Sequence, residues 1–295
     1  MSGLNQLEKV ECVAACDGGP DAPSIADGSN VPLDAIGADT SDAYAASDAM
    51  QGLADGGDAS AGGDANEGGS ASAYRAAVLA DSPVGYWRLG DPVGTTTCQP
   101  EDGLGQTGAV VGGVIFGVPG ALKGDANTAA QFDGTTGSID VGGALTFTGA
   151  APFSWEIWVR PAVLDGSFCP FLSSMTFDND GNPIDGTYMV SYSVSNQTFG
   201  FERYKGTNND VFALDLGGLQ VNVWTYIVGT SDGEGNGIVY MNGASVLSGA
   251  SSGAVPTYTA DTIFGQRFKG DLDEVAIYDH ALSAQSVLDH WNAAQ

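Results

Sequence analysis

The chain has 295 residues and a formal net charge of −27, from 36 acidic and nine basic side chains. Binding a nucleic-acid backbone or an anionic membrane surface requires clustered Lys and Arg, and the few basic residues here are scattered along the chain. The sequence also has no apolar run near the ~20 residues that a transmembrane helix needs, so we expect neither nucleic-acid binding nor a transmembrane segment.

Composition divides the chain at residue 72. Residues 1–72 hold ten Asp, three Glu and one Lys, a net charge of −12, and a single aromatic residue, Tyr44. A segment with few apolar side chains and much like charge buries too little surface to offset the entropy of ordering. We therefore predict that 1–72 is a disordered acidic tether. Residues 73–295, which carry all five Trp and all twelve Phe, are predicted to form one folded domain.

The segment Val13-Ala14-Ala15-Cys16 resembles the cleavage site of bacterial lipoproteins, in which small residues precede a Cys that becomes lipidated. The preceding residues are polar and lack the apolar stretch of an export signal. Chance is the alternative, because small residues before a Cys are common in an Ala-rich chain. On the first interpretation Cys16 carries a lipid anchor and the acidic segment tethers the domain to a bacterial surface.

The folded part is predicted to consist mainly of short strands, separated by Gly, Pro, Asn and Asp, as in an antiparallel sandwich. One turn of helix is expected at 74–79. The predicted strands, in chain order, are 86–89, 129–132, 138–141, 153–159, 171–174, 187–194, 198–204, 224–230, 237–241, 244–247, 262–265 and 272–278. Asn242-Gly243 predicts a type I′ hairpin turn, because both residues tolerate positive φ.

The last strand and a short helix close the chain. Strict alternation along 272–278 places the even-numbered residues on one face and the odd-numbered residues on the other, so Asp273 and Glu274 are expected on opposite faces. Ser283 is a good helix N-cap. The apolar stripe predicted to seal the edge of a sheet consists of Val287, Leu288 and Trp291.

Four segments resemble the laminin-G-like, concanavalin-A-like domains of bacterial secreted proteins. They are Gly-Tyr-Trp-Arg-Leu-Gly at 85–90, Ala-Gln-Phe-Asp-Gly at 130–134, Phe-Ser-Trp-Glu-Ile-Trp-Val-Arg-Pro at 153–161 and the Asp-Glu-Val-Ala-Ile-Tyr strand with its helix from residue 270. The resemblance covers about residues 73–295. It implies an all-β fold, a two-sheet antiparallel jelly-roll sandwich with one short C-terminal helix. It also implies an extracellular, cell-surface or periplasmic location.

The second face of strand 153–159 carries Glu156, Trp158 and, just beyond, Arg160, whereas the first face is apolar and belongs to the core. In related lectins one sheet is concave and holds saccharides, so the resemblance makes these three residues candidates for carbohydrate binding. Aromatic rings stack on sugar C–H groups, and charged groups bond hydroxyls. The alternative is that loops of the sandwich cover Trp158 and that Glu156 and Arg160 form a cross-strand pair.

The sequence does not predict catalysis. Jelly-roll glucanases carry Glu-x-Asp-x-Glu on one strand, because retaining cleavage needs two carboxylates ~5 Å apart. The segment 271–274 fails this pattern, since residue 275 is Val, and strand 153–159 supplies Glu156 alone. His280 and His290 have no nucleophile signature beside them.

Calcium is the expected inorganic partner. The resemblance implies one structural ion between the Phe-Asp-Gly turn and the last strand, held by Asp133, the carbonyl of Gly134 and Asp273, because Ca²⁺ takes six to eight oxygen ligands. The alternative is that Asp133 caps its own turn and Asp273 pairs with a base. A further acidic loop, 178–185, lacks the distant Glu of a calcium loop.

Cys98 and Cys169 lie in loop-like contexts of a secreted-looking domain, which predicts a disulfide between them. Two free thiols are the alternative.

These features favour a non-catalytic extracytoplasmic binding module that recognises carbohydrate or a cell-surface polymer. An adhesive or structural protein–protein module of the same fold is the first alternative, and a glycoside-active enzyme is the second.

Overall fold

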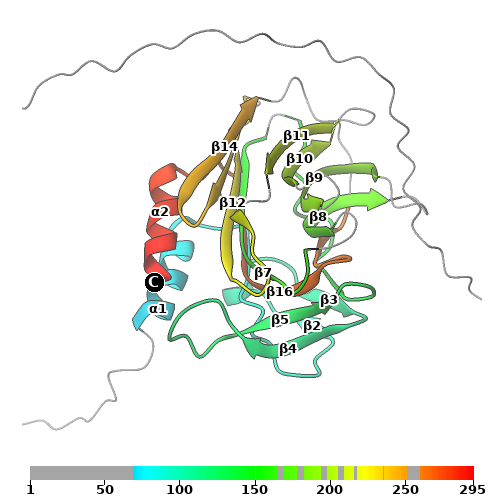
Figure 1. Ribbon diagram of the computed structural model, residues 1–295, viewed down its shortest axis with the longest axis vertical. Helices are drawn as coiled ribbons and strands as arrows, with labels where there is room; N and C mark the ends of the chain where they lie inside the picture. Colours follow the sequence, from blue (N-terminus) through cyan, green and yellow to red (C-terminus); the bar gives the residue numbers. More distant parts are fainter. Residues whose placement is uncertain are drawn as a thin grey trace, which may run out of the picture. The chain divides into compact units, whose positions relative to one another are not determined.

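Two antiparallel sheets lie face to face and enclose the apolar core, as the computed structural model shows (Figure 1). Sheet A has the order β14 (Ala244–Ala250), β13 (Asn236–Met241), β12 (Thr225–Ser231), β7 (Phe153–Pro161), β16 (Lys269–Tyr278), β5 (Thr128–Asp133) and β4 (Val114–Pro119), and β1 (Gly85–Trp87) also pairs with β16. Sheet B has the order β11 (Asn209–Asp215), β10 (Thr198–Tyr204), β9 (Pro183–Ser193), β8 (Cys169–Phe177), β15 (Thr262–Phe264), β6 (Ser138–Asp140), β3 (Gly108–Val111) and β2 (Thr97–Cys98). The predicted all-β, two-sheet fold is confirmed.

The structure describes residues 69–149, 151–164, 169–177, 183–193, 198–204, 209–215, 218–234, 236–250 and 260–295. They belong to one compact unit, Ala65–Gln295. The predicted lipidation at Cys16 and residues 178–182 of the acidic loop 178–185 lie outside the described residues. Neither helix in the described ranges combines the length and the apolar character needed to cross a membrane.

The core between the sheets is strongly aromatic. Trp155 of β7 is fully buried and meets Phe201 of β10 edge-on, with ring centroids 5.5 Å apart. Trp87 of β1 meets Phe264 of β15 in the same way at 5.2 Å. Aromatic pairs of this geometry contribute about 0.5–1.5 kcal/mol each beyond their area burial. The apolar face of strand 153–159 therefore lies in the core, as its alternation predicts.

Two helices, α1 (Gly69–Ala80) and α2 (Ala284–Ala293), pack side by side on the outer face of sheet A (Figure 1). A second apolar cluster joins them to the sheet through Tyr74, Val78 and Val287. The helical turn predicted at 74–79 is thus part of a longer helix, which begins inside the segment expected to be a tether. A short 3₁₀ turn, η1 (Glu101–Gly103), is linked to α1 by the ion pair Arg75–Glu101.

The closing helix α2 confirms its predicted cap, because the Ser283 hydroxyl accepts a hydrogen bond from the Ser286 amide at 3.0 Å. Its buried stripe differs from the prediction. Val287 is buried, but the Leu288 side chain is 39% exposed and His290 is buried instead. The helix therefore presents a polar side chain, as well as apolar ones, to the sheet.

A β-bulge in β16 breaks the predicted alternation. Asp273 pairs with Trp158 and Ala276 pairs with Glu156, so β16 has one more residue than β7 over this stretch. Glu274 takes the extra position with φ of 50°, a conformation that is uncommon for a non-glycine residue. Because of the bulge, Asp273 and Glu274 both lie on the side of the sheet away from the core, whereas the predicted alternation placed them on opposite faces.

Four strands were not predicted, namely β2, β3, β4 and β11. β3 and β4 are separated by Gly112-Gly113 and belong to different sheets, so this glycine pair carries the chain from sheet B to sheet A. The predicted type I′ turn is confirmed, since Asn242 and Gly243 have φ of 51° and 80° between β13 and β14.

The predicted disulfide is wrong. Cys98 is a buried free thiol on β2, and Cys169 begins β8. Between β8 and β2 lie β15, β6 and β3, so four strand spacings separate the two, about 19 Å. The Cα atoms of a disulfide lie about 4.4–6.8 Å apart. Sequence reasoning placed both cysteines in loops and had no measure of this separation.

Candidate functional site

Glu156, Trp158 and Arg160 do share the outer face of β7, as predicted, but two of them are buried there. Glu156 is fully buried, and Trp158 is 4% exposed. Of the three, Arg160 alone remains partly open, with 24% of its side chain exposed. The cover comes from α1 and α2 as well as from loop residues such as Leu122, whereas the alternative interpretation expected loops alone.

The Glu156 carboxylate holds the closing helix to the sheet. It accepts hydrogen bonds from the Tyr226 hydroxyl and, at 2.6 Å, from the Tyr278 hydroxyl. His290 Nδ1 lies 2.9 Å from Glu156 Oε2, and His290 Nε2 lies 3.2 Å from Asp81 at the end of α1. Burial lowers the pKa of His290, but the Glu156 and Asp81 carboxylates outweigh burial and raise this pKa to about 9. The imidazole is therefore charged at neutral pH and forms a buried ion pair with Glu156.

Trp158 belongs to an aromatic group beneath the helices. Its ring stacks on Trp291 of α2, with centroids 5.6 Å apart and planes 22° apart, and packs at 5.3 Å against Tyr226. Tyr74 of α1 meets it edge-on at 6.4 Å. The ring faces of Trp158 are thus occupied by protein, and a sugar cannot stack on them in this arrangement.

Arg160 belongs to a polar row that crosses sheet A beyond the helices, here called the Arg160 row: Gln131, Asp271, Arg160 and Trp224. The pairing of β5, β16 and β7 places Gln131, Asp271 and Arg160 side by side, and Trp224 directly precedes the β12 residue that pairs with Val159. These four strands span about 14 Å across the sheet.

The side chains of the Arg160 row contact one another directly. Arg160 Nε donates to Asp271 Oδ2 at 2.7 Å, and Gln131 Nε2 donates to Asp271 Oδ1 at 3.1 Å. The Arg160 guanidinium carbon lies 4.8 Å from the centre of the Trp224 ring, within cation–π range. Gln131 is exposed, Trp224 is half-buried and 8% of the Asp271 side chain is exposed. The row thus presents an exposed amide and a partly exposed guanidinium and aromatic ring, above a carboxylate that is itself nearly buried.

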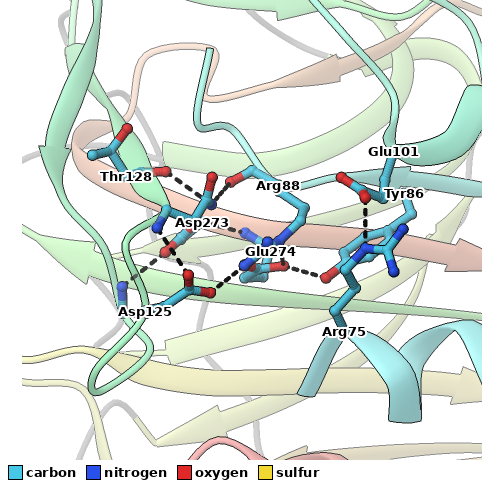
Figure 2. Close-up of polar contacts among 10 residues, drawn as sticks. Arg75, Tyr86, Arg88, Glu101, Asp125, Thr128, Asp273 and Glu274 are labelled. Atoms are coloured by element: carbon cyan, nitrogen blue, oxygen red, sulfur yellow. Dashed lines mark hydrogen bonds and ion pairs between the residues drawn. The ribbon is translucent and has the colours of Figure 1, made fainter. Parts of the chain in front are cut away.

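A second polar network lies where β1 meets the bulge of β16 (Figure 2). Arg88 donates through Nε and Nη2 to Glu274 Oε1 at 2.9 and 2.8 Å and also pairs with Asp125, while the Tyr86 hydroxyl donates to Glu274. Burial raises the pKa of Glu274 to about 7, although Arg88 opposes the shift. Burial and the neighbouring Glu274 also raise the pKa of Asp273.

This network fixes the segment between β4 and β5 against the last strand. Asp273 Oδ2 accepts a hydrogen bond from the Ala121 amide at 2.7 Å, and Asn127 Nδ2 donates to the Arg88 carbonyl at 2.9 Å. Leu122 of the same segment is buried in the helix-side cluster. We therefore assign the network a structural role, because each of its buried acids already has a partner.

The predicted calcium ligands do not form one site. Asp133 lies opposite Lys269, four residues before Asp273 on β16, so the backbone positions of Asp133 and Asp273 are about 13 Å apart along the strands. Asp133 Oδ1 accepts hydrogen bonds from the Thr135, Thr136 and Gly137 amides at 2.8–2.9 Å, and these bonds lower the pKa of Asp133. Asp133 therefore caps its own turn with Gly134, and the three predicted ligands do not fit a single calcium ion.

Sequence reasoning missed Gln131, Asp271 and Trp224 as partners of Arg160. Each of these residues lies in or next to a predicted strand, so the sequence did predict the strands that position them. What the sequence could not supply was the order β5-β16-β7-β12, which places them side by side. Arg88 and Asp125 were missed for the same reason.

Comparisons with known proteins agree with this architecture. The sequence profile described as the concanavalin A-like lectin/glucanases superfamily matches residues 133–288, more than half of the chain. No curated protein matches the sequence significantly.

Several solved structures share the fold. The binding domain of botulinum neurotoxin serotype G is 16% identical, with a TM-score of 0.55, and the match covers 71% of this chain and 50% of that one. The binding domain of Paraclostridial Mosquitocidal Protein 1 is 18% identical, with a TM-score of 0.56 and coverage of 73% and 53%. The binding domain of botulinum neurotoxin DC, in complex with SialylT, is 14% identical, with a TM-score of 0.54 and coverage of 73% and 52%.

This chain spans about half the length of those structures, and at such identities the likeness shows the fold alone. The resemblance drawn from four short sequence segments is nevertheless confirmed by the profile match. The chain belongs to the concanavalin A-like lectin/glucanase superfamily.

Proposed function

We propose that this protein is a non-catalytic carbohydrate-binding module that acts outside the cytoplasm, with the Arg160 row as its ligand surface. The observation that carries the proposal is the row itself. Trp224 supplies an aromatic ring, and Gln131 and Arg160 supply hydrogen-bonding groups at partly exposed positions of one sheet face. Saccharide sites combine these elements, because rings pack on sugar C–H groups and a few polar groups fix the hydroxyls.

The neighbours in fold support a binding role. They include binding domains of neurotoxins and of a mosquitocidal protein, and one of them was solved in complex with SialylT. The location outside the cytoplasm rests on this same likeness to toxin domains. Because fold alone does not determine function, the binding role is tested by the experiment described below.

The non-catalytic assignment rests on the placement of carboxylates. Glycoside hydrolysis uses two carboxyl groups, about 5–5.5 Å apart in retaining enzymes and about 6.5–9.5 Å apart in inverting ones. Asp271 is the one carboxylate of the Arg160 row, and it is engaged by Arg160 and Gln131. Glu156, the one carboxylate of strand 153–159, is sealed under α1 and α2.

An adhesive protein–protein module is the second candidate. Val223, directly before Trp224, is 46% exposed, and Val221, three residues before Trp224, is 43% exposed. Exposed apolar side chains beside an aromatic and an arginine are also common in protein interfaces.

Affinity gel electrophoresis against a panel of polysaccharides, with and without calcium, tests the proposal. We expect retardation by at least one polysaccharide and at least a ten-fold loss of affinity in Trp224→Ala. Gln285→Ala is a matched control, because Gln285 is an exposed side chain on α2, and it should bind like the wild type. A uniformly negative panel would favour the adhesive alternative, and release of reducing sugar by the wild type would overturn the non-catalytic assignment.

A further inference from the structure

The charge of Arg160 is neutralised inside the protein. Its Nε lies 2.7 Å from Asp271 Oδ2, and the two side chains are 24% and 8% exposed, so water screens the pair only partly. One face of the guanidinium also lies against Trp224. The row therefore carries a guanidinium but no net charge.

On the Lys269 side of the row, the adjoining charges are also balanced. The pairing of β5 with β16 places Asp133 opposite Lys269, two residues along each strand from Gln131 and Asp271. Residues 73–295 carry 23 acidic and eight basic side chains, a net charge of −15. A polyanion approaching this surface meets a repulsive field with no unpaired cation in the row to offset it.

The donors and acceptors of the row that are not used within the protein can hydrogen-bond the hydroxyl groups of a sugar. Among the described residues, Arg160 bonds to another side chain through Nε, while Nη1 and Nη2 make no such bond. Gln131 uses Nε2 toward Asp271, and its Oε1 is on an exposed side chain. Each oxygen of Asp271 accepts one of these bonds, and because only 8% of its side chain is exposed, Gln131 Oε1 is the accessible acceptor of the row. A sugar hydroxyl both donates and accepts, so neighbouring hydroxyls can use both kinds of group.

We propose that the Arg160 row selects uncharged polysaccharides and binds their neighbouring hydroxyls, with Asp271 cancelling the charge of Arg160 and holding its guanidinium in place. This inference rests on the proposed function, because it takes the Arg160 row as the ligand surface. Asp271 is then the residue that sets specificity between neutral and acidic glycans.

Matched polysaccharides test the inference on the full chain. Hydroxyethyl cellulose and carboxymethyl cellulose share a backbone and differ in charge, and laminarin, arabinan and polygalacturonate extend the panel. We expect at least ten-fold tighter binding to neutral than to acidic members. Raising the salt from low to high ionic strength should change the neutral affinity less than two-fold, since no counterions are displaced.

Two variants make the test specific to the row. Asp271→Asn keeps the shape and the hydrogen bond from Gln131 but leaves the charge of Arg160 unmatched, so we expect salt-sensitive binding of acidic polysaccharides and at least a five-fold fall in the neutral-to-acidic ratio. Gln131→Ala, at an exposed position where folding is not at risk, should weaken neutral binding about five-fold. Circular dichroism and the unfolding midpoint establish that each variant is folded.

The outcomes distinguish selectivity for uncharged polysaccharides from the proposed carbohydrate binding itself. A wild type that binds acidic members more tightly, or an Asp271→Asn variant with an unchanged neutral-to-acidic ratio, overturns the selectivity and leaves carbohydrate binding standing. A wild type that binds no polysaccharide overturns both. A neutral preference that Asp271→Asn reduces supports the inference.

Discussion

The imidazole of His290 and the carboxylate of Glu156 lie 2.9 Å apart between the closing helix and the centre of sheet A. The same carboxylate accepts a hydrogen bond from Tyr278 at 2.6 Å. A residue that the sequence offered as a ligand contact thus serves as the anchor of α2. The outer face of β7 is therefore covered at Glu156 and Trp158 and remains partly exposed at Arg160.

Alkaline pH should weaken this anchor. The pKa of His290 is raised to about 9, above its ordinary value of 6.5, so its stabilising effect is complete below pH ~6.5 and is lost as the pH rises through 9. A shift of this size corresponds to at most about 3 kcal/mol. Urea unfolding between pH 6 and 9 should show a falling free energy of unfolding that is largely absent in His290→Gln. His280→Gln is the control, because the His280 side chain is 43% exposed; an equal slope in all three proteins would refute the assignment.

Removing the Glu156 carboxylate should lower the free energy of unfolding far more than neutralising it. Glu156→Ala leaves the His290 imidazole and the Tyr226 and Tyr278 hydroxyls buried without their acceptor, which costs about 3–5 kcal/mol by comparison with other broken buried pairs. Glu156→Gln keeps an acceptor oxygen and should cost less. Chemical denaturation of both variants measures the difference, and a loss below 1 kcal/mol in Glu156→Ala would show that the helix is held by apolar packing alone.

The Cys98 thiol should be unreactive in the folded protein. It is fully buried, and burial followed by the nearby Asp91 raises its pKa, so little thiolate forms. We expect iodoacetamide to label Cys98 only after denaturation and the unfolding midpoint to be the same with and without reductant. Detection of a disulfide-linked peptide joining Cys98 to Cys169 would contradict the strand order of sheet B.

Those parts of the fold that depend on local periodicity could be predicted. Alternation assigned Trp155 and Ile157 to the core, a two-residue turn signal located the hairpin at Asn242, and a capping residue located the start of α2 at Ser283. Each of these depends on residues within a few positions of one another. The family resemblance likewise depends on short segments.

The remaining features depend on contacts between distant segments. What covers Glu156 is decided by α1 and α2, which lie at opposite ends of the folded unit in sequence. The bulge at Glu274 is decided by pairing with β7, and a single inserted residue moves every later side chain of the strand to the opposite face of the sheet from the one that strict alternation predicts. No local pattern encodes either relationship, so the sequence could show neither that Glu156 and Trp158 are covered nor that Glu274 lies at a bulge.

Asp133 should stabilise the domain equally with and without calcium. Its carboxylate accepts hydrogen bonds from three backbone amides of its own turn, so Asp133→Ala should lower stability by about 1 kcal/mol in calcium and in chelator alike. Those bonds lower the pKa of Asp133, so the contribution is present at neutral pH and fades in strong acid. Thermal unfolding of wild type and variant in both buffers measures it. A loss confined to the calcium buffer would restore Asp133 as a metal ligand.

The Arg88–Glu274 pair should show a pH-dependent penalty when broken. Arg88→Met leaves the fully buried Glu274 carboxylate without its cation, a change that costs about 3–5 kcal/mol in other buried pairs. Arg88 is what opposes the rise in the Glu274 pKa, now about 7, so without it the acid is protonated more readily. The loss in unfolding free energy caused by Arg88→Met should accordingly be larger at pH 8 than at pH 5. At pH 8 the buried Glu274 of the variant must either carry an unpaired charge or take up a proton at a free-energy cost, whereas at pH 5 it is already neutral.

The double variant Arg88→Met with Glu274→Gln should recover part of the loss at pH 8, because the two residues are coupled. Guanidinium denaturation at both pH values measures all four proteins, and a penalty independent of pH would show that Arg88 acts through packing and its bond to Asp125 alone.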